Sequence, residues 1–228
     1  MGKWIKLKAE DGHELGAYVA TPAQEPAGAL VVVQEIFGVN KSIRGVADEY
    51  ASEGFLAIAP ALFDRFERDL ELGYGEADMK KAFGIYPKLD PDVSLMDIAV
   101  AFHYGKQAGK ATGVLGFCYG GLISWLSATR GAKFKMKPDC CVGYYAGGIG
   151  KVAAEEPVCP VLLHFGAADD HIGKEQTDAV RRAHPEVEIY LYDGVGHAFA
   201  NPDRPSYNAA AAKLAHTRSL AFLKKNLA

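Results

Sequence analysis

The chain has 228 residues, of which 49% are hydrophobic and 23% charged, and this composition is ordinary for a soluble globular protein. Its formal net charge is -3, and it contains no run of lysine and arginine residues. The charge pattern therefore gives no indication that the protein binds a nucleic acid or an anionic membrane. We expect a single domain over residues 1–228, since α/β domains of this length commonly stay undivided.

The N-terminal residues and the cysteines together indicate the cellular compartment of the protein. No apolar stretch has the length of a signal peptide at the N-terminus, and none approaches a membrane span. The four cysteines are Cys118, Cys140, Cys141 and Cys159, and neither their spacing nor that of the histidines suggests a zinc site. Because no secretory signal accompanies them, we expect a cytoplasmic monomer with free thiols, no metal and no cofactor.

Eight apolar runs, bounded by glycine, proline or aspartate, predict strands. The first two runs alternate apolar and polar residues around Asp11-Gly12, which is a hairpin signal. The later runs are solidly apolar, as is typical of strands buried on both faces of a parallel sheet. The predicted strands are residues 4–9, 14–21, 29–34, 55–60, 112–117, 140–145, 161–166 and 187–192.

Helical patterns lie between most of these strands, and Gly54 is a plausible stop for the first of them. The predicted helices are residues 42–54, 92–108, 119–130, 173–184 and 206–226. Strands that alternate with helices predict an α/β fold, a mostly parallel doubly wound sheet with helices on both faces. Residues 61–91 fit this pattern poorly, and such a long charged excursion often forms part of a lid or pocket wall.

The segment from Gly116 to Gly120 reads G-x-C-x-G and lies between a predicted strand and a predicted helix. This is the context of a nucleophile elbow, in which a tight strand-to-helix turn presents the nucleophile, here Cys118. The helix that begins at this turn favours a thiolate through its dipole and free N–H groups. The alternative is that Cys118 is an ordinary buried cysteine and the glycines only pack helix against strand.

An acid and a histidine follow in the order that an α/β-hydrolase requires. Asp169 comes just after the strand 161–166, with Asp170 as an alternative, and His197 lies in a glycine-rich loop after the last strand. His197 would take the proton of Cys118, and the carboxylate would fix its tautomer. We expect His164 to be a core histidine. We expect the other five to lie at the surface: His13, His103, His171, His184 and His216.

These residues resemble the dienelactone hydrolase family, also called carboxymethylenebutenolidases. The resemblance spans nearly the whole chain, and a cysteine in the nucleophile turn makes it specific. It depends on five segments: Gln34-Glu35-Ile36-Phe37-Gly38, Gly116-Phe117-Cys118-Tyr119-Gly120-Gly121, Gly143-Tyr144-Tyr145, the G-x-x-D that ends at Asp169, and Gly196-His197-Ala198-Phe199.

The resemblance implies an α/β-hydrolase fold and a hydrolase that cleaves a small ester or lactone through a thioester on Cys118. It implies that Glu35 holds the resting cysteine as a neutral thiol until substrate displaces the carboxylate. The alternative is a solvated or structurally paired glutamate. It also implies an oxyanion hole made of the backbone N–H groups of Ile36 and Tyr119. Substrate contacts are expected from Phe37, Tyr145, Phe199 and Asn201.

The chain departs from the family pattern where the best-known members bind the substrate carboxylate with two arginines. Asn201 stands at one of these positions, and residues 78–82 contain lysines but no arginine at the other. Arg65, Arg68 and Arg204 lie nearby in the sequence and are candidates to compensate. Two further functions stay open: a broader carboxylesterase or thioesterase for neutral substrates, and a catalytically silent fold used for binding.

Overall fold

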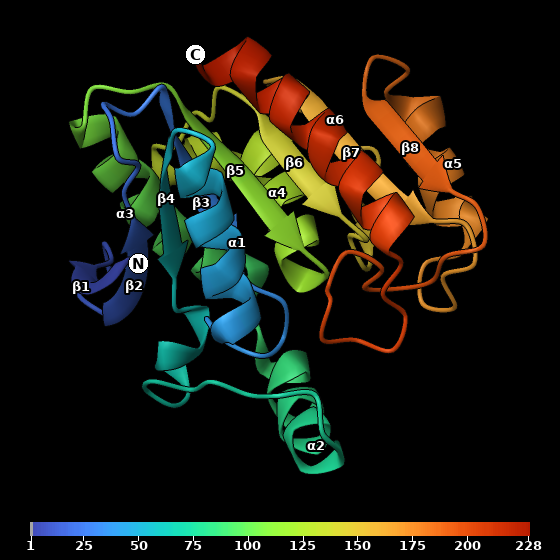
Figure 1. The fold of residues 1–228 in the computed structure, drawn as a ribbon, viewed down its shortest axis with the longest axis horizontal. Coiled ribbons are helices and arrows are strands. Elements are labelled where there is room, and N and C mark those ends of the chain that lie inside the picture. Colours follow the sequence, from blue (N-terminus) through green and yellow to red (C-terminus); the bar gives the residue numbers. More distant parts are fainter. Residues whose placement is uncertain (1) are drawn as a thin grey trace.

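The computed structural model describes residues 2–228, and its centre is one eight-stranded sheet (Figure 1). The strand order across the sheet is β1-β2-β4-β3-β5-β6-β7-β8. The strands are β1 (Lys3–Lys8), β2 (Glu14–Ala20), β3 (Gly28–Val33), β4 (Phe55–Pro60), β5 (Thr112–Phe117), β6 (Cys141–Tyr144), β7 (Val161–Gly166) and β8 (Glu188–Tyr192).

The sheet is parallel from β4 to β8, and β2 pairs with both β1 and β4 in antiparallel register. All residues of β3, β4, β5, β6 and β7 are buried, as solidly apolar strands covered on both faces should be. This confirms the predicted α/β fold, and each predicted strand lies within one residue or two of its observed bounds.

Helices cover both faces of the sheet (Figure 1). Helices α1 and α6 lie over one face, and α3, α4 and α5 lie over the other, so the sheet is doubly wound. The helices are α1 (Lys41–Ser52), α2 (Glu76–Ile85), α3 (Pro91–Gln107), α4 (Tyr119–Arg130), α5 (Lys174–Ala183) and α6 (Ala209–Leu227). No helix in the described part of the chain is long and apolar enough to span a lipid bilayer.

Several helices begin where a polar side chain satisfies free backbone N–H groups. Asn40 accepts a hydrogen bond from the N–H of Ile43 at the start of α1, and Asn208 caps α6 in the same way. Asp90 caps α3, and Pro91 occupies its first position, where no N–H is needed. These caps fix the loops that leave the carboxyl ends of the strands.

Residues 61–91 contain a helix that the sequence pattern did not predict. Helix α2 lies between two short 3₁₀ helices, Leu62–Arg65 and Tyr86–Lys88, and projects beyond the carboxyl edge of the sheet (Figure 1). Only Ala82 and Ile85 of α2 are buried, so the helix lacks the broad apolar stripe by which a packed helix is predicted. The start of the excursion is held by Arg65, whose guanidinium contacts the buried Asp97 at 2.7 Å.

Candidate active site

Cys118 lies in a strained turn between β5 and α4. Its backbone has φ 55° and ψ −114°, a conformation that non-glycine residues rarely adopt. The flanking glycines make the turn possible. A Cβ on Gly116 would lie 2.0 Å from the carbonyl oxygen of Gly120, and one on Gly120 would lie 2.4 Å from that of Val33. The sequence therefore folds here into the predicted nucleophile elbow.

The turn presents the thiol of Cys118 at the carboxyl edge of the sheet. The Cys118 N–H donates to the carbonyl of Tyr144 at 3.0 Å, which ties the turn to the end of β6. The cysteine stays partly exposed, whereas Cys140 and Cys141 are buried. It is also the residue that precedes α4, so the positive end of the helix dipole lies beside the sulfur and favours negative charge there.

Asp169 lies just after β7, and its carboxylate contacts the ring of His197. The carboxylate Oδ2 lies 2.8 Å from His197 Nδ1, and Oδ1 accepts hydrogen bonds from the N–H groups of His171 and Ile172. Burial opposes ionisation of Asp169, but its contact with His197 and these hydrogen bonds hold the pKa of the carboxyl below its usual value. Asp170, the alternative acid, is exposed and makes no contact with His197.

His197 lies between this carboxylate and the cysteine. Burial would lower the pKa of His197, but the hydrogen bond that His197 donates to Asp169 and the influence of Cys118 outweigh it and raise the pKa to about 10. An imidazole with this pKa carries a proton at neutral pH. His197 is therefore an imidazolium that lies beside the sulfur of Cys118.

Cys118 and His197 open into a pocket of about 240 Å³. Its wall includes three residues of the 61–91 excursion, Met79, Phe83 and Tyr86, so the expected contribution of that segment to a pocket wall is confirmed. No periodic pattern in the sequence predicted that these three residues would line the pocket. The remaining lining residues are Glu35, Ile36, Phe37, Gly147, Gly148, His171 and Arg204.

A larger groove of about 580 Å³ runs along β1 and β2, lined by Trp4, Asp64 and Arg68 among others. None of its lining residues is a cysteine, serine or histidine. Size therefore does not identify the functional site in this protein. The smaller pocket is the candidate site because it combines a partly exposed thiol, an imidazole fixed by Asp169 and a buried carboxylate.

The buried carboxylate is Glu35, just after β3. Asn201 donates a hydrogen bond of 2.9 Å to Glu35 Oε2, and the same amide nitrogen lies 2.8 Å from the Tyr74 hydroxyl. Burial raises the pKa of Glu35, against the opposing influence of Arg204, Asn201, His197 and Tyr74. Asn201 itself does not line the thiol pocket, and its amide contacts Glu35 instead.

Arg204 is the arginine that reaches the pocket. Its guanidinium lies 5.5 Å from the centre of the Phe37 ring and 5.4 Å from that of Tyr74, and no carboxylate of the described residues lies within 4 Å of it. Arg65 is engaged with Asp97 and Asp11, and Arg68 lines the groove along β1 and β2. Of the three compensating arginines suggested by the sequence, only Arg204 is positioned to meet a ligand beside Cys118.

Two further predicted substrate contacts have no access to the pocket. Phe199 has no exposed surface, and Tyr145 is 1% exposed, because their rings pack against each other with a centroid distance of 5.6 Å. Tyr145 also supports the ring of His197 from 5.0 Å. We therefore assign these two aromatic side chains a packing role behind the histidine, while Phe37 does line the pocket.

The backbone donors expected to form an oxyanion hole are available. Ile36 lines the pocket, and Tyr119 is the first residue of α4, next to Cys118. Within the described part of the chain, neither backbone N–H donates to a backbone carbonyl. The Tyr119 side chain points away to Ser94, with 2.7 Å between the two hydroxyl oxygens.

Two of the other histidines lie as predicted, whereas His13, His103 and His216, which were expected at the surface, are half-buried. His164 is buried and hydrogen-bonded to Tyr192 and Ser219 at 2.9 Å each, and burial lowers its pKa to about 3. His171 is exposed and lines the pocket. The surface location predicted for His184 is wrong: it is 3% exposed because the end of α5 packs it against Trp125.

The fold and the order of these groups define an α/β-hydrolase, with a nucleophile candidate after β5, an acid after β7 and a histidine after β8. Residues 15–227 match the family model of the dienelactone hydrolase family. The chain belongs to this family, and it is a hydrolase of carboxylic esters or lactones.

Individual relatives agree with this assignment. A carboxymethylenebutenolidase of Pseudomonas putida is 31% identical, over 96% of this chain and 94% of the relative. One of Pseudomonas sp. strain P51 is 29% identical, over 97% and 94%. The crystal structure of a "Putative Dienelactone Hydrolase" from Klebsiella pneumoniae has 29% sequence identity and a TM-score of 0.80, and covers 96% of this chain and 98% of that one.

Proposed function

We propose that this hydrolase cleaves a small ester or lactone through a Cys118–His197–Asp169 triad and a thioester intermediate. The observation that carries the proposal is the His197–Asp169 contact of 2.8 Å beside a partly exposed cysteine in an elbow turn. A carboxylate that fixes the tautomer of a histidine next to a nucleophile is the arrangement required for acyl transfer. The cytoplasmic location and the monomeric state stay predictions from the sequence.

The proposed reaction has two halves. The thiolate of Cys118 attacks the carbonyl carbon, and the backbone N–H groups of Ile36 and Tyr119 stabilise the oxyanion that forms. Collapse of this intermediate breaks the ester C–O bond, and protonated His197 gives its proton to the departing alkoxide. Neutral His197 then takes a proton from water, whose oxygen attacks the thioester, and the carboxylic acid leaves as Cys118 is regenerated.

The pocket supports a small substrate. Its volume is about 240 Å³, and Phe37, Met79, Phe83 and Tyr86 supply mostly apolar surface. Arg204 adds one positive charge at the same wall, which favours a substrate with a carboxylate. Because the two arginines of the best-known family members are not matched in the sequence, a broader esterase for neutral substrates is the second candidate.

Replacement of the nucleophile tests the proposal. Cys118→Ala is expected to lower turnover of aryl esters and unsaturated lactones about 1,000-fold or more, with an unchanged melting temperature. Iodoacetamide is expected to inactivate the wild type in step with alkylation of Cys118, identified by peptide mass spectrometry. Cys159→Ala is the matched control, since Cys159 is also partly exposed but lies away from the pocket. Activity of Cys118→Ala within tenfold of wild type would rule out the mechanism.

A further inference from the structure

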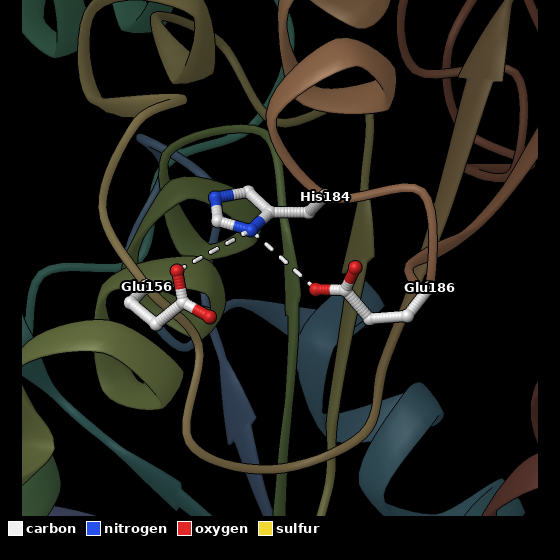
Figure 2. Close-up of side chains that lie close together, drawn as sticks. All are labelled: Glu156, His184 and Glu186. Carbon is white, nitrogen blue, oxygen red and sulfur yellow. Dashed lines mark ion pairs between the residues drawn. The ribbon is translucent and has the colours of Figure 1, made fainter.

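Three side chains with metal-binding atoms converge at the edge of the sheet opposite the thiol pocket (Figure 2). Glu156 precedes β7, and His184 and Glu186 precede β8, so all three lie near the amino ends of these strands. Their nearest donor atoms all lie within 4.8 Å of one another. Figure 2 shows both carboxylates directed toward the same ring nitrogen, His184 Nδ1.

His184 is buried, and within the described part of the chain neither of its ring nitrogens makes a hydrogen bond. Its side chain is 4% exposed and packs against Trp125, and it ends helix α5 as the C-cap residue. The ring nitrogen Nε2 is buried without a partner. Nδ1 points between the carboxylates but lies 3.4 Å from Glu186 Oε1 and 3.8 Å from Glu156 Oε2, beyond the usual length of a hydrogen bond.

The 3.4 Å separation matches an edge of a coordination tetrahedron, and the 3.8 Å separation is somewhat longer. Zinc bonds to imidazole nitrogen and carboxylate oxygen are about 2.0–2.2 Å long, which gives edges of about 3.4 Å between tetrahedral ligands. The two glutamates also lack a lysine or arginine within 4 Å in the described part of the chain, so their charges are not neutralised. The C-terminal end of α5 adds partial negative charge beside His184 and favours a cation.

The geometry points to a divalent cation site, best suited to Zn²⁺, formed by His184 Nδ1, Glu156 and Glu186 with water at the fourth position. The cation gives Nδ1 the partner that the protein does not supply, and it joins the loop before β7 to the turn before β8. This site is structural and takes no part in ester cleavage, because Cys118 lies at the carboxyl edge of the sheet. The chain spacing of Glu156 and His184 resembles no zinc motif, which explains why the sequence predicted no metal.

Zinc titration of the Cys118→Ala variant tests this site, since that substitution removes the thiol of the catalytic pocket as a competing ligand. Calorimetry is expected to detect zinc binding to Cys118→Ala. Addition of the double change Glu156→Gln/Glu186→Gln to this variant is expected to lower the zinc affinity by roughly tenfold or more. Zinc is expected to raise the melting temperature of Cys118→Ala but not that of the variant that also carries Glu156→Gln/Glu186→Gln. Glu188→Gln, which alters an exposed glutamate just outside the cluster, is expected to leave zinc affinity unchanged.

Two further measurements distinguish zinc bound by His184, Glu156 and Glu186 from zinc bound by other side chains such as cysteines. Co²⁺ bound to Cys118→Ala is expected to show the visible absorption of a four-coordinate nitrogen–oxygen site, without thiolate charge-transfer bands. In the wild-type background, Glu156→Gln/Glu186→Gln is expected to keep full esterase activity when no zinc is added. Absence of zinc binding, equal affinity in the double variant or thiolate bands in the Co²⁺ spectrum would each overturn the assignment.

Discussion

Asn201 donates a hydrogen bond of 2.9 Å to Glu35 Oε2, and this contact holds the carboxylate beside the thiol pocket. Glu35 is 3% exposed and lines the pocket that contains Cys118. Arg204 and His197 favour the ionised form of Glu35, whereas burial opposes it. The pair of residues thus places an ionisable carboxyl group at the wall of the pocket that contains the nucleophile candidate.

We predict that Glu35→Gln reacts faster with iodoacetamide than the wild type in the absence of substrate. Removal of a negative charge near the sulfur favours the thiolate, which is the species that is alkylated. A pH titration of the alkylation rate measures the effect, and Glu49→Gln, at an exposed glutamate of α1, is the control. Superimposable curves for wild type and Glu35→Gln would show that Glu35 is structural.

Asp169→Asn and Asp170→Asn are expected to differ strongly. Asp169 contacts His197 at 2.8 Å, so its amide variant loses the charge that stabilises the imidazolium and orients the ring. We expect kcat to fall roughly 1,000-fold or more for Asp169→Asn. Asp170→Asn alters an exposed neighbour and is expected to lose little. Steady-state kinetics decide the question, and the reverse order of effects would move the acid to Asp170.

Arg204→Gln is expected to raise KM for esters and lactones that carry a carboxylate by about tenfold or more, because a charged hydrogen bond is lost. KM for neutral aryl acetates is expected to change little. Arg68→Gln is the matched control, since Arg68 lines the separate groove along β1 and β2. Equal losses for anionic and neutral substrates would mean that Arg204 supports the pocket and does not select charge.

The His197–Asp169 contact is expected to make stability depend on pH. The pKa of His197 is about 10 in the folded protein, above the 6.5 of an unperturbed histidine, so the folded state binds the proton more tightly. The stabilisation is fully present below pH 6.5 and is lost as pH rises toward 10. Denaturant unfolding of wild type and His197→Gln at several pH values measures it. A stability difference that stays constant or grows with rising pH contradicts the prediction.

The sequence predicted the parts of the site that local chain geometry determines. Cys118 could be singled out because the G-x-C-x-G turn between strand and helix leaves room for its strained backbone. Asp169 and His197 follow strands whose ends meet at one edge of the sheet. These three positions therefore depend on patterns that extend over a few residues each.

Contacts between distant segments could not be predicted in this way. Helix α2 could not be predicted from the sequence pattern because only two of its residues are buried. Its residues Met79 and Phe83 line the pocket together with residues from other loops. Arg204 enters the pocket through the path of the loop after His197, which no periodicity specifies. His184 is polar and ends a helix, so its burial depends on the position of Trp125 in another helix.

The position of α2 outside the sheet also bears on how this protein can diverge from its relatives. The thiol, aspartate and histidine follow β5, β7 and β8, of which β5 and β7 are fully buried, so changes there cost stability as well as activity. Met79 and Phe83 lie on a peripheral helix with few buried residues. We expect substitutions at these two positions to change which acyl or alcohol groups fit the pocket, with little effect on the melting temperature of the protein.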